Sequence, residues 1–362
     1  MIEETQIRPL VQLRGRGTAE NPPNRFVQMD FVPDYDHLDP EAPGPATTLL
    51  RDVTRTIISR NDSPDVGFDA SVNPYRGCEH GCIYCFARPT HEYFGLSAGL
   101  DFETKIFVKE DAPELLRDAL AHPRWEPEMI AMSGVTDCYQ PIERKLRLTR
   151  RCLEVLAEFR NPVSIITKNH LVTRDADILG EMARWNGSVV NVSITSLDET
   201  LQRVMEPRTS TPARRLAAVE ALAKAGVPVR VLAAPMIPGL NDHELPAILK
   251  ASADAGARTS SFIPLRLPWA LKELFDTWLA THFPERREKV LHRIREIRGG
   301  KLNDPSFGSR MKGQGEYANQ LRTLYRAAAR KAGIDGPLPP LSTEHFRRPH
   351  DRSGQMGLFE AA

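Results

Sequence analysis

The chain has 362 residues, of which 41% are hydrophobic and 26% are charged, a composition typical of globular proteins. Its 48 Lys and Arg residues balance 47 Asp and Glu residues, so no overall charge draws the chain to nucleic acid. No run of about 18 apolar residues occurs, which excludes a membrane-spanning helix. Residues 1–17 lack the apolar core of a signal peptide. We therefore expect a cytoplasmic protein with no membrane partner.

The first part of the chain, residues 1–69, is predicted to be an extended segment because Pro, Gly and Asp recur in residues 15–26 and 33–47. From residue 70, six β-rich runs alternate with amphipathic helical stretches. The runs cover residues 70–75, 129–133, 163–167, 189–194, 229–236 and 260–265. Such alternation predicts an α/β fold whose parallel strands are joined by right-handed helical crossovers.

Helix boundaries support this alternation. Apolar residues recur at helical spacing in 148–159, where Cys152 is predicted to be a core residue. Thr211 is a predicted N-cap before a helix that stops at Gly226, and Asp242 is the predicted cap of the next helix. Six units are fewer than the eight of a complete barrel, and periodicity leaves both a barrel and an open sheet possible. In either case, ligands are expected at the carboxyl ends of the strands.

The alternation of strands and helices ends near residue 269. A helical extension is predicted for residues 269–333, and a Pro-rich flexible tail for residues 334–362. Residues 285–330 hold 12 Lys or Arg against 5 Asp or Glu, so this lobe is basic. A basic lobe beside the strand ends is suited to following a DNA phosphate backbone, and a solvated helix face is the alternative. The candidate DNA contacts are Arg293, Arg298, Arg310 and Lys312.

The most informative stretch is RGCEHGCIYCFAR, directly after the first predicted strand. Cys78, Cys82 and Cys85 are spaced C-x3-C-x2-C, which places three thiolates on one short loop. A [4Fe–4S] cluster has four irons, so three cysteines leave one iron open for a ligand. The spacing therefore favours an iron–sulfur cluster.

The alternatives to the cluster are a structural zinc site and a disulfide framework. A structural zinc site needs four protein ligands, and His80 or His91 is a candidate for the fourth. The other cysteines, Cys138 and Cys152, lie more than fifty residues away. A disulfide framework is not expected, because five cysteines are an odd number and nothing indicates secretion.

At this loop the sequence resembles the radical S-adenosylmethionine (SAM) superfamily, whose signature is C-x3-C-x-aromatic-C after the first strand of a partial (β/α)6 TIM-type barrel. Tyr84 is the aromatic residue of that signature. The resemblance spans residues 70–268 and implies a radical SAM core barrel with a helical C-terminal extension. It further implies a [4Fe–4S] cluster on the three cysteines, SAM on the open iron, and cleavage of SAM to methionine and a 5′-deoxyadenosyl radical. An electron donor such as flavodoxin or ferredoxin is then required.

Other stretches match positions at which the superfamily binds SAM. Each also has an ordinary structural interpretation, such as a turn, a solvated side chain, a buried serine or a helix cap. The resemblance assigns to SAM binding, besides Tyr84, the residues Ser133, Gly134, Thr136, Asp137, Lys168, Ser193, Arg208, Ile237 and Gly239.

Within the superfamily, the cysteine loop, Lys168 and Ser193 resemble spore photoproduct lyase, a DNA repair enzyme that reverses a thymine dimer. The hydrogen-donor cysteine of the lyase aligns with Gly134 and its relay tyrosine with Phe86, so the same relay is not predicted. Over most of the chain the sequence is similar to the lyase-like PA0069-type radical SAM proteins, which bring no established substrate.

Just beyond the second predicted strand, Cys138 and Tyr139 are candidate catalytic residues. A thiol is a good hydrogen-atom donor, and the neighbouring phenol is a candidate radical relay. The alternative is a small residue packed in a turn. The catalytic interpretation requires that the side chains of Cys138 and Tyr139 face the carboxyl ends of the strands.

Three functions stay open: a radical SAM enzyme that repairs or modifies a nucleic acid base, a radical SAM enzyme acting on a peptide or small molecule, and a non-catalytic zinc-stabilised binding module. Gln355, Leu358 and Phe359 favour the first, because they resemble the bacterial peptide that binds the DNA sliding clamp. In that peptide a Gln and a Leu-Phe pair fill an apolar pocket. An end of the chain without a partner is the alternative.

Overall fold

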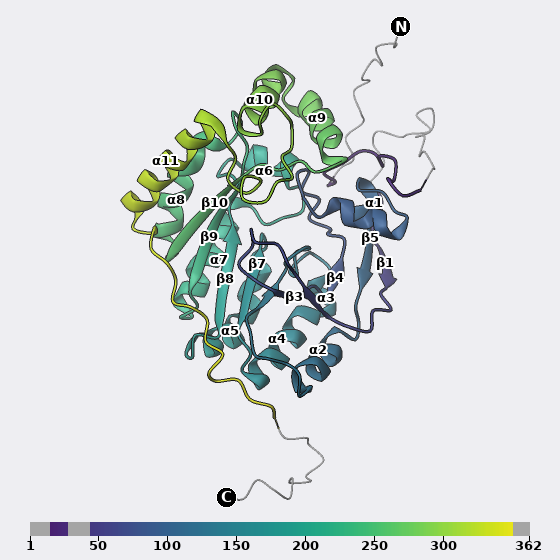
Figure 1. Ribbon diagram of the computed structural model, residues 1–362, viewed down its shortest axis with the longest axis vertical. Coiled ribbons are helices and arrows are strands. Elements are labelled where there is room, and N and C mark those ends of the chain that lie inside the picture. The colour runs from purple at the N-terminus through teal and green to yellow at the C-terminus, as the bar shows by residue number, and fades with distance from the viewer. Residues whose placement is uncertain (1–14, 28–43, 350–362) are drawn as a thin grey trace, which may run out of the picture.

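The computed structural model describes residues 15–27 and 44–349. Its main sheet has seven strands in the order β10-β9-β8-β7-β6-β3-β2. Six of them are parallel: β3 (Ala70–Val72), β6 (Ile130–Met132), β7 (Val163–Thr167), β8 (Ser188–Ser193), β9 (Val229–Met236) and β10 (Thr259–Pro264). β2 (Ile58–Arg60) pairs antiparallel with β3 at one edge. The sheet does not close on itself, so the predicted partial barrel is confirmed (Figure 1).

The helices between these strands cover one face of the sheet (Figure 1). The longer ones are α2 (Ala112–Ala121), α4 (Leu148–Phe159), α5 (Ala176–Ala183), α7 (Pro212–Lys224) and α8 (Leu245–Asp254). Shorter ones are η1 (Arg88–Phe94), α1 (Leu100–Thr104), α3 (Glu143–Leu146), η2 (His170–Asp175), α6 (Glu199–Met205) and η3 (Asp242–Glu244). Apolar side chains of the strands and of the longer helices form the main core, which includes the buried Cys152.

Two predicted caps have different outcomes. Thr211 caps α7 as predicted, because its hydroxyl accepts a hydrogen bond from the backbone N–H of Arg214. The prediction for Asp242 is wrong. This residue lies within η3, before α8 begins, and its carboxylate accepts the hydroxyl of Tyr317 instead.

A second sheet was not predicted. It has the order β1-β5-β4 and consists of β1 (Thr48–Arg51), β5 (Lys105–Val108) and β4 (Tyr75–Arg76). The N-terminal segment therefore contributes a strand to each sheet, β1 here and β2 to the barrel. Since β4 leads directly into the cysteine loop, this small sheet fixes the start of that loop.

Three helices follow the barrel: α9 (Leu271–His282), α10 (Pro284–Ile297) and α11 (Gly315–Ala332). α11 lies against β10, where the ring of Tyr325 packs tilted against Phe262, with centroids 4.8 Å apart, and its hydroxyl donates to the carbonyl of Ser260 at 2.7 Å. In the described residues no helix has both the length and the apolar character needed to cross a membrane.

The predicted flexible tail differs from the structure up to residue 349. Ile334 is buried in the main core, and Phe346 packs against that core. The backbone N–H groups of Ser342 and Arg347 donate to the carbonyls of Asn186 and Phe159 at 3.0 and 2.9 Å. Gln355, Leu358 and Phe359 lie outside the described residues, so the sliding-clamp contact stays a prediction.

Candidate functional site

The cysteine loop lies where the small sheet meets the carboxyl ends of the barrel strands. Cys78 and Cys82 are buried and Cys85 is partly exposed. Cys78 and Cys85 share one apolar cluster, and Cys85 also packs against the cluster that holds Cys82. The backbone of residues 16–18 crosses the loop so closely that a Cβ at Gly17 would lie 1.7 Å from the carbonyl oxygen of Gly81. Only glycine fits at that crossing.

The donor set fits an iron–sulfur cluster better than a single metal ion. Burial raises the pKa of all three thiols, so a metal that displaces their protons is what stabilises thiolates here. Within residues 15–27 and 44–349, no three His, Cys, Asp or Glu side chains gather as ligands of one ion. In a [4Fe–4S] cluster each cysteine binds its own iron, so the thiolates need not converge on one point.

The two histidines considered as zinc ligands have other partners. His80 places Nδ1 3.3 Å from Oδ2 of Asp137 and Nε2 3.1 Å from Nδ2 of Asn169. His91 is buried among aromatic rings, with Nε2 2.9 Å from the carbonyl oxygen of Lys105. Burial lowers the pKa of His91 to about 4, so this ring is neutral near pH 7. His80 thus links the loop to the side chains of Asp137 and Asn169, and His91 links η1 to the start of β5.

Asp137 connects the cysteine loop with two strand ends. Besides His80, its carboxylate accepts the hydroxyl of Thr167 at 2.8 Å and the backbone N–H of Lys168 at 2.8 Å. Burial opposes ionisation, but the histidine and these hydrogen bonds hold the pKa of Asp137 below its usual value. An ionised Asp137 thus ties β6 and β7 to the loop.

A second network lies under Tyr84. The Tyr84 hydroxyl donates to Glu206, which also accepts the Thr195 hydroxyl at 2.7 Å and pairs with Arg215. Both members of this ion pair have only 1% of their side chains exposed. This pair could not be predicted from the sequence, because the burial of Glu206, in the stretch MEPRTSTP, is apparent only in the structure. It fixes the aromatic residue of the cysteine motif to the end of β8.

The predicted SAM-binding residues surround these networks. The Lys168 ammonium lies 5.8 Å from the centroid of the Tyr84 ring. The guanidinium of Arg208 lies 3.2 Å from Glu79 inside the loop, and the carbonyl of Ser193 accepts a hydrogen bond from Arg215 at 3.1 Å. These residues therefore meet at one site, and their contact with SAM stays a prediction.

The remaining turn residues lie after β6 and β9. Ser133 has φ +73° and accepts the backbone N–H of Cys138, while the Thr136 hydroxyl donates to the carbonyl of Tyr75. A Cβ at Gly134 would lie 3.2 Å from that of Ser71, so this turn packs tightly against β3. Two further residues follow β9: Ile237, which is buried with Cys82 and Tyr84, and Gly239, which has φ +79°.

Cys138 and Tyr139 belong to the main core. Cys138 is 1% exposed, and the hydroxyl of the fully buried Tyr139 donates to Asp175 at 3.1 Å. Neither side chain takes part in the two networks that surround the loop. This packing favours the structural interpretation over the catalytic one.

We therefore expect Cys138→Ser to leave both the rate of SAM cleavage and the product unchanged. The physical reason is that a buried thiol packed in a turn acts as a small apolar group. Quantifying 5′-deoxyadenosine by chromatography checks this, with Cys82→Ser as the inactive comparison. A variant that cleaves SAM normally but forms no product would establish Cys138 as the hydrogen donor.

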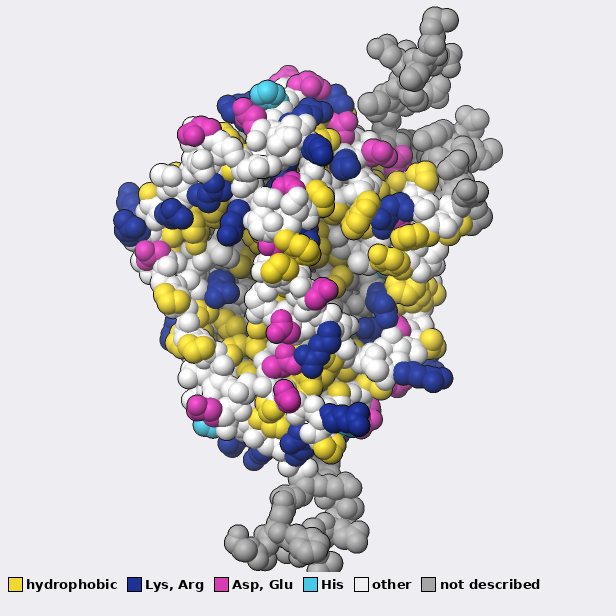
Figure 2. Space-filling view, viewed as in Figure 1, with side chains coloured by type: hydrophobic (Ala, Val, Ile, Leu, Met, Phe, Trp, Pro, Cys, Tyr) yellow, Lys and Arg dark blue, Asp and Glu magenta, His cyan; other side chains and the backbone are white. Residues whose placement is uncertain are grey.

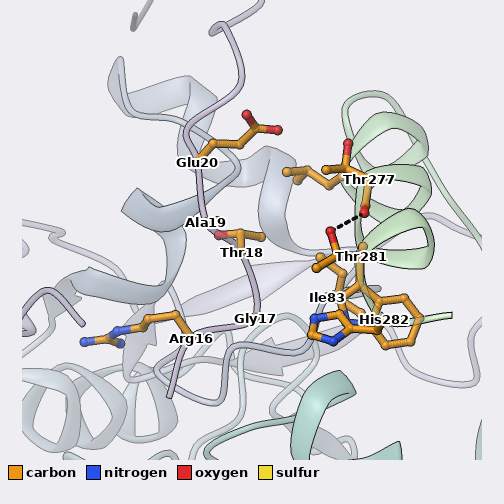
Figure 3. Close-up of a pocket in the computed structure, with 11 residues that line it drawn as sticks. Arg16, Gly17, Thr18, Ala19, Glu20, Ile83, Thr277, Thr281 and His282 are labelled. Carbon is orange, nitrogen blue, oxygen red and sulfur yellow. Dashed lines mark hydrogen bonds between the residues drawn. The ribbon is translucent and has the colours of Figure 1, made fainter. Parts of the chain in front are cut away.

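A small pocket lies behind the loop, between residues 16–20, Ile83 and α9 (Figure 3). Arg16 points away from it, because its guanidinium donates to the carbonyl of Glu103 at 3.1 Å. Thr277 and Thr281 face it from α9 and are joined by a hydrogen bond of 2.9 Å. Among the described residues, no cysteine and no predicted SAM-binding residue lines this pocket, so it is separate from the predicted site.

One predicted DNA contact is corrected by the structure. Arg298 is 1% exposed, and its guanidinium donates to the carbonyls of Pro264, Leu265 and Arg310, so it holds the chain after β10 in place. Arg293 and Arg310 pair with Glu296 and Asp65. Lys312 is exposed.

Comparison with known proteins identifies relatives of this site. The sequence model of the radical SAM superfamily matches residues 72–251. An uncharacterized protein of Mycobacterium tuberculosis is 37% identical over 276 residues, which cover 75% of this chain and 78% of that protein. An uncharacterized protein of Methanocaldococcus jannaschii is 31% identical over 173 residues, 48% of this chain and 62% of that protein.

Solved structures share the fold. Spore photoproduct lyase complexed with dinucleoside spore photoproduct superposes with a TM-score of 0.58 at 18% identity, covering 79% of this chain and 81% of that one. A mutant of the same lyase with bound AdoMet and dinucleoside spore photoproduct gives 0.57 at 18% identity over the same shares.

Proposed function

The chain belongs to the radical SAM superfamily, and from this premise we propose that it is an enzyme that repairs or modifies a nucleic acid base. Radical SAM enzymes use a [4Fe–4S] cluster and SAM, which together supply a 5′-deoxyadenosyl radical. In this chain Cys78, Cys82 and Cys85 would hold the cluster. The Asp137 and Glu206 networks keep the loop and strand ends in place, and Lys168 adds a positive charge beside Tyr84.

The fold supports a nucleic acid substrate. The lyase that shares it was solved with a dinucleoside photoproduct. Low identity leaves the substrate of this chain open, and Gly134 and Phe86 stand where the hydrogen donor and the relay tyrosine of the lyase align. The proposal therefore concerns the substrate class and leaves the particular lesion or base undefined.

The observation that carries the proposal is a basic surface on the helical extension. Its exposed cations lack an acidic partner among the described residues, so they are free to meet phosphates. They are Arg286, Lys289, Arg295, Lys301, Lys312 and Arg326. Lys and Arg side chains gather over α11 and α10 in Figure 2. The inner face of α10 packs in the cluster that holds Cys82 and Tyr84. A Cβ at Gly239 would lie 3.9 Å from Cγ of Lys289, so the α10 part of this surface lies near one predicted site residue.

The test is the salt dependence of DNA binding. Replacing Lys301 and Lys312 with Ala should weaken binding of a labelled oligonucleotide and reduce the slope of log K against log salt by about 1.5, because each phosphate contact contributes about 0.7–0.9. Fluorescence anisotropy between low and physiological salt measures both quantities.

The matched control removes two lysines elsewhere. Lys224 and Lys250 are exposed on α7 and α8 and pair with acidic residues on their own helices, so their double Ala variant should bind DNA normally. Absence of DNA binding by the unaltered protein at low salt would remove the nucleic acid proposal and leave a peptide or a small molecule as the substrate.

A further inference from the structure

Beside the cysteine loop, four planar side chains form a row that we call the stacking ladder: Tyr93, Phe26, Arg25 and Trp269. The rings of Tyr93 and Phe26 stack with centroids 5.1 Å apart and planes 26° apart. The guanidinium of Arg25 lies 5.0 Å from the Phe26 centroid and 4.3 Å from the Trp269 centroid. The ladder thus joins residues from three separate segments of the chain.

The ladder is exposed although three of its four members are large aromatic residues. Tyr93, Phe26 and Trp269 are 70%, 58% and 56% exposed. Large aromatic side chains in one exposed group are unusual on a protein surface and mark interaction sites. Figure 2 shows apolar side chains gathered toward the upper right, on the side where Figure 1 places α1 and β5.

Arg25, the cation of the ladder, is held in place through one nitrogen of its guanidinium and keeps two nitrogens as hydrogen-bond donors. Nε of Arg25 lies 2.7 Å from Oε2 of Glu92, whose side chain is fully buried. Asn24 fastens the same segment to η1, because its amide donates to the carbonyls of Glu92 and Leu96 at 3.0 and 2.8 Å. In the described chain the two terminal nitrogens of Arg25 have no hydrogen-bond partner, so they can meet an anion or a base edge.

The conformation of Trp269 adds a second observation. Its φ is +48°, a left-handed conformation that costs a bulky residue about 1 kcal/mol or more. The residue is 56% exposed, and the guanidinium of Arg25 lies over its ring. Strain of this kind is typical of positions kept for a ligand.

The ladder also lies next to the cysteine loop. η1 begins three residues after Cys85, and Phe86 between them is 52% exposed. On the other side, Trp269 lies in the connection between β10 and α9. Leu267 in this connection and Leu271 at the start of α9 belong to the apolar cluster that includes Cys82 and Tyr84. A ligand on the ladder therefore lies at the rim of the site.

We propose that the stacking ladder binds unpaired bases of a nucleic acid strand. Aromatic and guanidinium planes offer faces for base stacking, and the free nitrogens of Arg25 offer donors to phosphate. Bases inside a duplex are already stacked, so the ladder selects single-stranded or splayed-out nucleotides. This inference rests on the proposed function and deepens it, because it names the strand state of the substrate.

The experiment compares a labelled oligothymidylate with a duplex of the same length, using the full chain and fluorescence anisotropy. Trp269→Ala should weaken single-strand binding about 5- to 100-fold and leave duplex binding unchanged, because one base–aromatic stack is lost. Trp269→Phe, which keeps a ring, should retain most of the affinity. In the unaltered protein the oligothymidylate should quench a tryptophan emission that Trp269→Phe lacks.

The matched control is Phe307→Ala. Phe307 is 61% exposed with Arg310 4.4 Å from its ring, yet it lies outside the ladder. Its removal should not change the ratio of single-strand to duplex affinity. If Trp269→Ala lowers neither affinity, or lowers both equally, the ladder proposal is wrong while the nucleic acid function stands. If the unaltered protein binds neither probe, both proposals fall.

Discussion

Replacing Cys82 with Ala is expected to reduce 5′-deoxyadenosine formation by more than about a hundredfold. Loss of residues that merely orient metal ligands costs 10- to 100-fold, so loss of a ligand itself should cost at least as much. Cys82 is buried in the apolar cluster that holds Tyr84, whereas the two cysteines outside the loop, Cys138 and Cys152, lie in the main core. Iron and sulfide analysis after anaerobic reconstitution, together with chromatography of the SAM products, measures the effect.

Cys152→Ala is the matched control. This thiol is equally buried, but it faces the core from α4. Its removal leaves a small cavity that costs about 1 kcal/mol of stability, and iron content and SAM cleavage should stay normal. Full SAM cleavage by the Cys82 variant would show that the cluster is held by other residues.

Arg215→Met is expected to destabilise the fold by about 3–5 kcal/mol, because it leaves Glu206 buried without its cation. The substitution also removes hydrogen bonds to the carbonyls of Ser193 and Ser210. Urea unfolding measures the stability. SAM binding by the reconstituted protein should weaken as well, because Glu206 no longer holds Tyr84 in one position.

Two comparisons separate the buried pair from a general effect of losing a charge. Arg151→Met breaks an exposed pair with Glu114, and such pairs contribute about 0–1 kcal/mol. The double variant Arg215→Met, Glu206→Gln removes the uncompensated charge and should recover part of the stability. If Arg215→Met costs no more than Arg151→Met, the pair does not hold the site together.

Much of the barrel could be predicted because short apolar runs alternate with helical stretches along the chain. The runs 163–167 and 229–236 bury alternate residues, and the structure has β7 and β9 within those bounds. The cysteine motif could also be predicted, since its three ligands lie within one loop. The same holds for Thr211, because an N-cap is a local signal.

The features that were missed depend on distant contacts. β1 has mostly exposed residues and no alternation, so only its pairing with β5 makes it a strand. From the sequence, Arg298 is predicted to be a surface cation, because its carbonyl partners around β10 are apparent only in the structure. Residues after 334 contain prolines typical of loops, yet Phe346 among them packs against the main core. In the site, the partners of Tyr84 lie more than a hundred residues away.

An incomplete barrel must also avoid polymerising. β10 ends the sheet, and a strand in that position offers unpaired backbone groups to any second chain. Along β10, the Tyr325 hydroxyl donates to the carbonyl of Ser260, and the hydroxyls of Thr259 and Ser260 donate to the carbonyls of Gly336 and Ile334. α11 and the segment behind it thus act as a cover against edge-to-edge aggregation, so the barrel stays open without exposing a template for fibrils.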